Sequence, residues 1–316
     1  MTIHTRYYRN ADITLQVNSD LPFKSDTFDR KFEKFRVEEP GEDLARIHHH
    51  FSLPEIDLEG LGKPAYHKAP WSIYPSENGW TYVGILPEGF ENQLWKVARF
   101  NNDHTIGHIY HPGPESWLLG NWHSLTTFPS DQIWLARLLA DRGGCYLHSA
   151  GAIINGKGFL FVGHSDAGKS TTTQMLINAS QRADSPLEVD ILCDDRNIVC
   201  FRPEGWRVYG SWSHGDIPLV SAASAPLQAV CFLEQAQENQ LIALTDRREI
   251  LKRLLACLIK PFPTADWWGQ TLDMLEDLAG AVPTYRMRFD TSGEVVKMIA
   301  ELGVVKTDTN RLLTSE

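Results

Sequence analysis

The segment FLFVGHSDAGKSTTTQML, residues 159–176, constrains this chain more than any other part of its sequence. Residues Gly163 to Ser170 match the pattern G-x-x-x-x-G-K-[ST], in which two glycines let backbone N–H groups turn toward a bound phosphate. Lys169 supplies a positive charge for the β- and γ-phosphates, and the Ser170 hydroxyl is placed to bind Mg²⁺. The residues predicted to bind the phosphates are Gly163, Ser165, Asp166, Ala167, Gly168, Lys169, Ser170 and Thr171.

The residues on either side of this motif decide whether the match is more than chance. An apolar run of strand length, Gly158 to Val162, precedes the motif, and a plausible helix, STTTQMLINA, follows it. A helix that begins directly after the loop points the positive end of its dipole at the anion. Because both flanks fit, the sequence predicts a phosphate-binding loop, and a glycine turn that matches by coincidence is disfavoured.

A pair of acids ends the apolar run EVDILCDD, at Asp194 and Asp195. One helix, one turn and one strand fit between the loop and this pair, so we expect the acids on a neighbouring strand, at the edge where the phosphates lie. One aspartate can hold the metal ion while the other accepts the proton of an attacking hydroxyl, a role favoured by a pKa that like-charge crowding raises. The alternative is a solvated turn, which the apolar residues 191–193 before it make less favourable.

The chain divides into two predicted domains and a tail, and its fold class is α/β. Residues 1–125 contain alternating runs such as ADITLQV and a hairpin around Asn101–His104, which predict a mostly β domain. A helix is expected from about Thr127 to Gly143, and residues 126–304 then combine compact apolar strands with helices, a pattern typical of a buried sheet covered by helices. Residues 305–316 are expected to form a flexible tail.

Composition and charge exclude several classes of protein. The formal net charge of −10 argues against a nucleic-acid or membrane partner, and no run of Lys and Arg reverses it. The N-terminal segment lacks the apolar core of a signal peptide, so we expect a cytoplasmic protein. Five cysteines without a C-x-x-C pair are expected to be reduced core thiols. The absence of N-K-x-D and L-S-G-G-Q disfavours switch GTPases and transporter ATPases.

Two polar segments stand outside these patterns. The triplet His48-His49-His50 is interpreted as spare histidines on a half-exposed strand, because metal binding would need ligands converging from elsewhere. The loop GSWSHGD, residues 210–216, contains Trp212, His214 and Asp216. It either contacts the acceptor or metal at the phosphate site or is an ordinary exposed turn.

Residues 145–300 resemble the HPr kinase/phosphorylase family, whose fold is similar to that of phosphoenolpyruvate carboxykinase. The resemblance is carried by YLHSAGAIINGKGFLFVGHSDAGKST, LCDDRNIV, YGSWSHGD and APLQAVCFLEQ, and more weakly by VPTYRMRFDTSGEVV. The order of a histidine strand, a glycine hairpin, the phosphate loop and a double aspartate is far more specific than the loop alone. The resemblance implies a P-loop kinase domain of this type, which follows the β-rich first domain in the sequence.

Carried over residue by residue, the resemblance implies roles for five side chains. His148 lies beside the phosphates and the acids, Lys169 binds the donor phosphate, and Ser170 binds Mg²⁺. Asp194 is the base that deprotonates a serine hydroxyl, and Asp195 lies near the metal ion and His148. The reverse division of duties between the two acids also fits. The implied activity is ATP-dependent, Mg²⁺-requiring transfer of a phosphoryl group to a hydroxyl.

The chain departs from that family at two places. Asp166 stands inside the loop where the family usually has glycine, which brings a negative side chain near the anion unless it points to solvent. No match is found to the C-terminal stretch with which the family grips HPr. We therefore expect another acceptor: a serine-bearing protein or peptide, including peptides of the kind made in modification gene clusters, recognised by residues 1–125.

Three alternatives stay open at this point. The chain can be a nucleotide-binding regulatory or scaffold protein without transfer, which Asp166 favours. It can phosphorylate a small metabolite, such as a free amino acid or a sugar. Its donor can be ADP, GTP or pyrophosphate in place of ATP, because the loop reads phosphates and not bases. Related kinases often assemble through their kinase domains, so a homo-oligomer is also possible.

Overall fold

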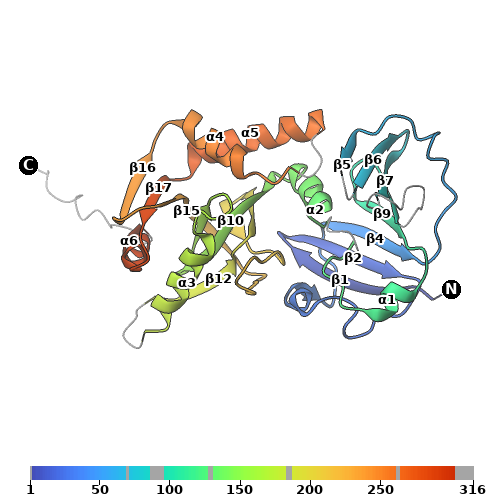
Figure 1. Cartoon of the computed structure of the whole chain (residues 1–316), viewed down its shortest axis with the longest axis horizontal. Coiled ribbons are helices and arrows are strands. Elements are labelled where there is room, and N and C mark those ends of the chain that lie inside the picture. Colours follow the sequence, from blue (N-terminus) through green and yellow to red (C-terminus); the bar gives the residue numbers. More distant parts are fainter. Residues whose placement is uncertain are drawn as a thin grey trace, which may run out of the picture.

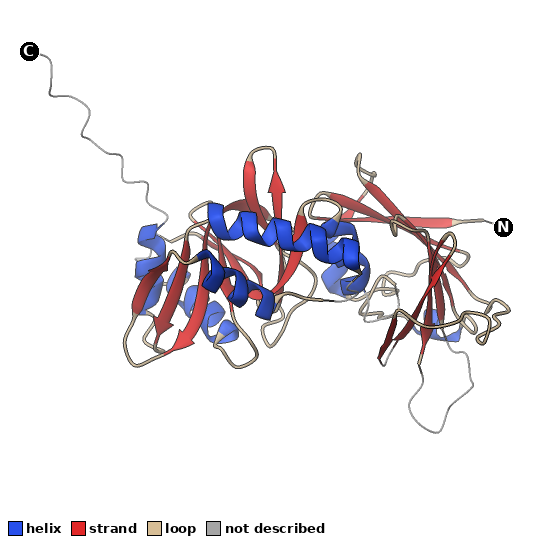
Figure 2. Cartoon of the chain, turned by 90° about the horizontal axis from the view of Figure 1, so that it is seen from above, coloured by secondary structure: helices blue, strands red, loops and turns tan. Residues whose placement is uncertain are grey.

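The computed structural model describes residues 2–68, 71–85, 96–126, 131–182, 187–260 and 264–302. Within them the chain is a mixed α/β protein, built mostly of strands that form two large sheets (Figures 1 and 2). Residues 4–110 supply the strands of one sheet and residues 144–289 those of the other, with helix α2 (Asp131–Ala140) between them. No helix in the described part of the chain is long and apolar enough to cross a membrane.

The first sheet has nine strands in the order β3-β1-β2-β4-β9-β8-β7-β6-β5. The strands are β1 (His4–Asn10), β2 (Ile13–Ser19), β3 (Arg36–Val37), β4 (Leu44–His50), β5 (Tyr66–Lys68), β6 (Trp71–Ser76), β7 (Gly79–Gly84), β8 (Val97–Phe100) and β9 (Ile106–Tyr110). Strands β2, β4 and β9 run parallel to one another. A 3-10 helix (Arg30–Phe35) and helix α1 (Glu115–Leu119) accompany this sheet.

The sequence predictions for this sheet are largely confirmed. Strands β8 and β9 pair as the hairpin expected around Asn101–His104. The strand expected in residues 11–17 begins later, at Ile13, because Ala11 and Asp12 form a turn with φ of 48° and 67°. The parallel pairings were not expected, since alternation within a strand does not say which strand lies beside it.

The second sheet has eight strands, of which β10 is central. The strands are β10 (Gly144–Ile154), β11 (Lys157–Val162), β12 (Val189–Cys193), β13 (Arg196–Arg202), β14 (Gly205–Tyr209), β15 (Ser224–Gln235), β16 (Gln240–Leu244) and β17 (Thr284–Phe289). The first half of β10 pairs with β13, and its second half lies between β11 and β12. Strand β11 also pairs in parallel with β15, and β15 in parallel with β17.

Helices cover both faces of this sheet, as the apolar runs predicted. Leu160 and Val162 of β11 pack in one apolar cluster with α4 (Arg247–Cys257) and α5 (Ala265–Ala281). Phe159 and Phe161 pack in another with α3 (Lys169–Ser180) and α6 (Glu294–Leu302). Successive residues of a strand face opposite sides of a sheet, so a strand with helices on both faces must be apolar throughout.

Helix α2 and the chain end test two further expectations. The helix begins at Asp131, while residues 127–130, where its start was expected, lie outside the described residues, as do residues 305–316. The helix ends at Ala140, and Gly143 then has φ of 62°, in agreement with the predicted glycine stop. All five cysteines are buried and free, as expected.

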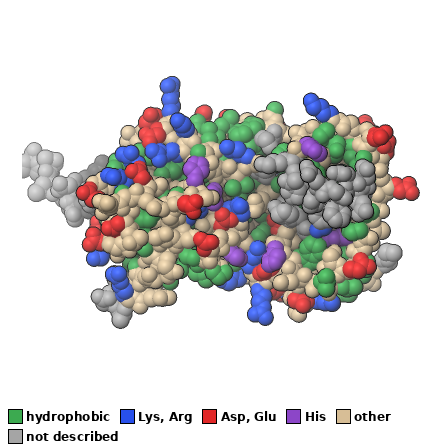
Figure 3. All heavy atoms as spheres, in the orientation of Figure 1, with side chains coloured by type: hydrophobic (Ala, Val, Ile, Leu, Met, Phe, Trp, Pro, Cys, Tyr) green, Lys and Arg blue, Asp and Glu red, His purple; other side chains and the backbone are tan. Residues whose placement is uncertain are grey.

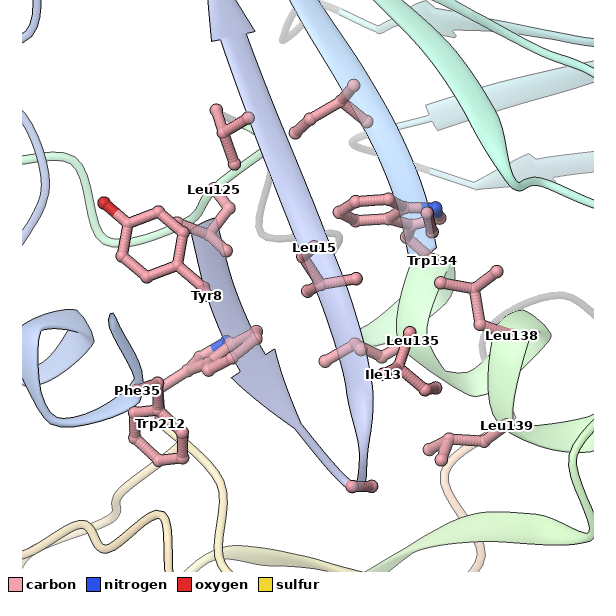
Figure 4. Packing of buried hydrophobic residues seen from close by; sticks show 14 of the residues in the cluster. Tyr8, Ile13, Leu15, Phe35, Leu125, Trp134, Leu135, Leu138, Leu139 and Trp212 are labelled. Carbon is pink, nitrogen blue, oxygen red and sulfur yellow. The ribbon is translucent and has the colours of Figure 1, made fainter. Parts of the chain in front are cut away.

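One apolar cluster joins the two sheets. Leu15 of the first sheet, Trp134 and Leu138 of α2, and Trp212 from the second half of the chain belong to it (Figure 4). Polar contacts support the same junction: Asp12 accepts hydrogen bonds from Arg202 Nε (3.0 Å) and from the hydroxyl of Tyr209 (2.5 Å). The predicted boundary near residue 125 falls between the sheets, but the parts on either side share a core.

Candidate active site

The predicted phosphate-binding loop connects β11 to α3 at one edge of the second sheet. Gly168, the last residue before the helix, has φ of 98°, and a Cβ there would lie 2.6 Å from the ring of Phe289. Only glycine satisfies both conditions. Helix α3 begins at Lys169, so the N–H groups of its first turn have no partners within the helix and face the loop.

Lys169 is buried against the loop that precedes it. Its ammonium group donates hydrogen bonds to the carbonyl oxygens of His164 (2.8 Å) and Gly163 (3.2 Å). Burial lowers the pKa of this ammonium, and the nearby carboxylates of Asp195 and Asp194 oppose that shift. A bound phosphate would therefore give the Lys169 ammonium an anionic partner in place of the two carbonyl oxygens.

Asp166 occupies a backbone position that suits glycine. Its φ is 64°, in the left-handed region, and its carbonyl oxygen accepts a hydrogen bond from Gln235 Nε2 at 2.7 Å. The side chain is exposed, yet Asp166 is part of the lining of the cleft described below. The left-handed backbone explains why glycine suits this position, and the carboxylate places a negative charge beside the predicted phosphate site.

Replacing Asp166 with glycine is expected to tighten nucleotide binding by about three- to tenfold, because a like charge is removed from the cleft rim. Asp166→Asn tests the charge alone, since asparagine also tolerates the left-handed region. Calorimetry with nucleotide and Mg²⁺ on the wild type and both variants measures the effect. Equal affinities in all three proteins would mean that this carboxylate does not act on the bound phosphates.

The two acids form the turn between β12 and β13, and Asp194 contacts the loop. Its Oδ2 accepts a hydrogen bond from Ser170 Oγ at 3.1 Å, which joins the two predicted motifs directly. The same carboxylate accepts backbone N–H bonds from Gly215 (2.7 Å) and Ile217 (2.9 Å). Asp194 is buried, so these donors supply the hydrogen bonds that water supplies to an exposed carboxylate.

Asp195 belongs to a different set of contacts. Its carboxylate lies 3.2 Å from His148 Nε2 and 2.7 Å from Arg196, and it accepts a hydrogen bond from Ser213 Oγ at 3.1 Å. Burial raises the pKa of Asp195, but the hydrogen bond from His148 and the charge of Arg196 outweigh burial and hold that pKa below its usual value. The raised pKa that like-charge crowding was expected to give one of the acids is therefore absent at Asp195.

The strand order explains how His148 enters the site and corrects one expectation. The acids were expected on the strand next to the loop's strand, but β10 lies between β11 and β12. Strand β10 is antiparallel to both, so its residue His148 lies at the edge where β11 ends in the loop and β12 ends in the acids. The intervening strand thus supplies the histidine.

These residues line one open cleft of about 510 Å³. The predicted residues in its lining are His148, Ser165, Asp166, Gly168, Lys169, Ser170, Thr171, Asp194 and Asp195. The other two predicted phosphate ligands, Gly163 and Ala167, line a different cavity, together with residues of α4. Gly215, Asp216 and Gln235 complete the cleft. Gln235 was missed, and its place at the end of the apolar run of β15 was the only signal for it.

The loop of residues 210–216 does contribute to the cleft, but Trp212, His214 and Asp216 lie in different surroundings. Asp216 Oδ2 lies 3.4 Å from Ser170 Oγ, whereas Trp212 is buried between the sheets. His214 is half-buried, and the partner of its Nδ1 is the carbonyl of Gly215. The loop also supplies Ser213 and the backbone N–H groups that hold the two acids, which side-chain chemistry alone did not suggest.

The side chains around Ser170 suit a hard cation. The Ser170 hydroxyl and the carboxylates of Asp194 and Asp216 place oxygen donors together, the ligand type that Mg²⁺ prefers. Asp194 already binds two backbone N–H groups, so its position is fixed without a metal ion. The donor set therefore fits the predicted Mg²⁺.

The chain was also compared with known proteins. No protein-family model matches its sequence, and the comparison with curated proteins gives no match either.

Proposed function

We propose that this chain is an ATP- and Mg²⁺-dependent kinase with a P-loop domain of the HPr kinase/phosphoenolpyruvate carboxykinase type. Its acceptor is a hydroxyl group, in particular the serine hydroxyl of a protein or peptide other than HPr. The observation that carries the proposal is the hydrogen bond between Ser170 and Asp194, which links the phosphate loop to the double aspartate. His148, the third part of the resemblance, lines the same cleft.

The donor phosphates fit the positive side of the cleft. The Lys169 ammonium, the loop N–H groups and the start of α3 all present positive charge to an anion. Ser170 and Asp194 would hold Mg²⁺, which when bound neutralises charge on the transferring phosphoryl group. These residues of the chain bind and orient the donor, which is the larger part of catalysis in phosphoryl transfer.

The transfer also needs a group that receives the acceptor's proton. As the hydroxyl O–H bond breaks, its oxygen bonds to the terminal phosphorus, and the bond from that phosphorus to the leaving diphosphate breaks. We assign proton acceptance to Asp195 together with His148, because the two groups are already in contact and both line the cleft. Asp194, which the resemblance made the base, is assigned to the metal ion because its partner is Ser170.

A second cavity, of about 410 Å³ between the two sheets, supports acceptor binding by the first domain. Its lining includes Lys31, Trp122, His123, Ser124, Tyr146, Arg196, Trp212 and Ser213. Arg196 and Ser213 also hold Asp195, which lines the proposed catalytic cleft, so these two side chains connect this cavity to that carboxylate. An acceptor bound here would reach the proposed base past these two side chains.

Incubation of the full chain with γ-labelled ATP, Mg²⁺ and serine-bearing peptides or proteins tests the proposal. Lys169→Ala is expected to reduce transfer by about 10²–10³-fold, because it removes the main positive charge that stabilises the transferring phosphoryl group. Lys157→Ala is the matched control: this lysine lies at the start of β11, the strand that leads into the loop, and contacts Gln228, away from the cleft. Equal labelling by the wild type and Lys169→Ala would overturn the enzyme assignment.

A nucleotide-binding scaffold without transfer is the second candidate, and the charge of Asp166 in the cleft lining favours it. Calorimetry separates the two functions when it is combined with the labelling assay. A kinase binds nucleotide and transfers its phosphate in the presence of acceptor. Tight binding without turnover in every acceptor pool, in the wild type and in Asp166→Gly, would identify a scaffold.

A further inference from the structure

A second group of converging polar side chains lies on the first sheet. The carboxylate of Asp20 contacts His48 Nε2 at 2.7 Å through one oxygen and His50 Nδ1 at 3.0 Å through the other. All three side chains are half-buried, and one ligand atom from each lies within 4.8 Å of the others. This group supplies the converging ligand that the histidine triplet lacked in the sequence.

The register of three parallel strands brings these residues together. His48 and His50 are two residues apart on β4, so they share one face of the sheet. Asp20 directly follows β2, whose last residue, Ser19, pairs with His49. His49 points to the opposite face, where it is buried and its Nε2 contacts the carbonyl of Leu125 at 2.9 Å. The alternation of β4 thus separates one core histidine from two that face Asp20.

A third histidine orients the group from β9. His108 pairs with His48 in register, and its Nδ1 lies 3.0 Å from His50 Nε2. When this bond uses the Nε2 proton of His50, the Nδ1 lone pair of the same ring faces Asp20. A ligating histidine commonly donates its other ring N–H to an outer partner in this way. The rings of His48 and His50 are also stacked, with centroids 4.3 Å apart, which restricts both.

We propose that Asp20, His48 and His50 bind one divalent transition-metal ion, of which Zn²⁺ is the representative. Two imidazole nitrogens and one carboxylate oxygen suit Zn²⁺, whereas Mg²⁺ prefers oxygen ligands. Ligand atoms about 2.0–2.2 Å from one Zn²⁺ lie roughly 3–3.5 Å from each other, so small side-chain rotations open the present contacts enough. His108 acts as the outer partner of His50.

The site is separate from the proposed kinase cleft and has a structural consequence. None of its residues lines that cleft; His48 and His50 belong to the first sheet, and Asp20 directly follows its strand β2. The ion would tie the end of β2 to the end of β4. Arg99, which pairs in register with His108, is a cation on a neighbouring strand, so the single carboxylate of Asp20 must carry the attraction for the dication.

Zinc titration of the full chain, prepared without a histidine tag, tests the proposal by calorimetry and by thermal unfolding. Excess Mg²⁺ is present throughout to occupy the oxygen ligands around Ser170. The wild type is expected to bind one Zn²⁺ and to unfold at a higher temperature with it. Both effects should disappear in His48→Gln and in Asp20→Asn, and His108→Gln should weaken binding by about 10–100-fold.

His123→Gln is the matched control, because His123 also pairs with a single aspartate, Asp29, at 3.0 Å, and within the described residues no second histidine pairs with that aspartate. This variant should bind Zn²⁺ like the wild type. The proposal is overturned if the wild type binds no Zn²⁺, if His48→Gln binds it unchanged, or if His123→Gln loses it equally. No readout depends on phosphoryl transfer, so the result stands whatever the fate of the kinase proposal.

Discussion

Asp194→Asn is expected to slow phosphoryl transfer by about 10³-fold and to raise the Mg²⁺ concentration that transfer requires. The change removes a negative charge 3.1 Å from Ser170, where the cation is proposed to bind. The asparagine amide accepts hydrogen bonds only through its oxygen, because its nitrogen is a donor. Either Gly215 or Ile217 therefore loses the acceptor of its backbone N–H. Transfer rates measured across a Mg²⁺ series report both effects.

Two further variants make this prediction specific. Asp195→Asn is expected to leave Mg²⁺-dependent nucleotide binding intact, to slow the transfer step and to change its pH profile, because Asp195 contacts His148. Asp190→Asn is the matched control, on the strand β12 that leads to the two acids: the partner of Asp190 is Ser221 at 3.4 Å, and the activity of this variant should equal that of the wild type. If Asp195→Asn raised the Mg²⁺ requirement and Asp194→Asn did not, the two acids would have the opposite roles.

The parts of the site that sequence could predict are those written in contiguous residues. The loop, its strand and its helix need only local turn chemistry and a buried strand, so residues 158–179 were sufficient. The acids were located because an apolar strand ends at them. The strand that contains His148 was expected, but its position between β11 and β12 was not, because β10 pairs with three partners at once and pairing is set by the whole sheet.

Composition gives the overall charge of the surface, but it does not give the partners of single side chains. Figure 3 shows acidic and basic side chains interspersed over the visible face, in keeping with a net charge spread along the sequence. By contrast, the group of Asp20, His48 and His50 depends on the parallel pairing of β2 with β4, which crosses 30 residues of sequence between Asp20 and His50. Composition located the histidines but not their partner.

The junction between the sheets carries the other large prediction. Trp212 is 3% exposed and packs against Phe32 and Phe35 of the first half of the chain, with ring centroids 5.3 and 5.2 Å away. Figure 4 shows Trp212 beside Phe35. The next residue, Ser213, holds Asp195, and Gly215 holds Asp194. The aromatic ring thus anchors the loop that fixes both acids, and it does so on the N-terminal part of the molecule.

Trp212→Ala is therefore expected to lower the free energy of unfolding by about 3–5 kcal/mol, through the cavity it leaves, and to reduce the transfer rate at least about tenfold in the folded protein. Urea unfolding and transfer rates at saturating nucleotide measure the two effects. Trp212→Phe retains a ring in the cluster, so it should fold and recover most of the rate if the alanine variant is too unstable to assay.

Trp134→Ala separates loss of anchoring from loss of stability. Trp134 is 2% exposed in the same cluster, but it belongs to α2 and its indole N–H donates to the carbonyl of His104, far from the acids in sequence and in contacts. This variant should lose similar stability and keep the wild-type transfer rate while folded. An equal loss of rate in both variants would mean that the positions of the two acids depend on the core as a whole. An unchanged rate in Trp212→Ala would mean that the hydrogen bonds to the two acids persist without the Trp212 ring.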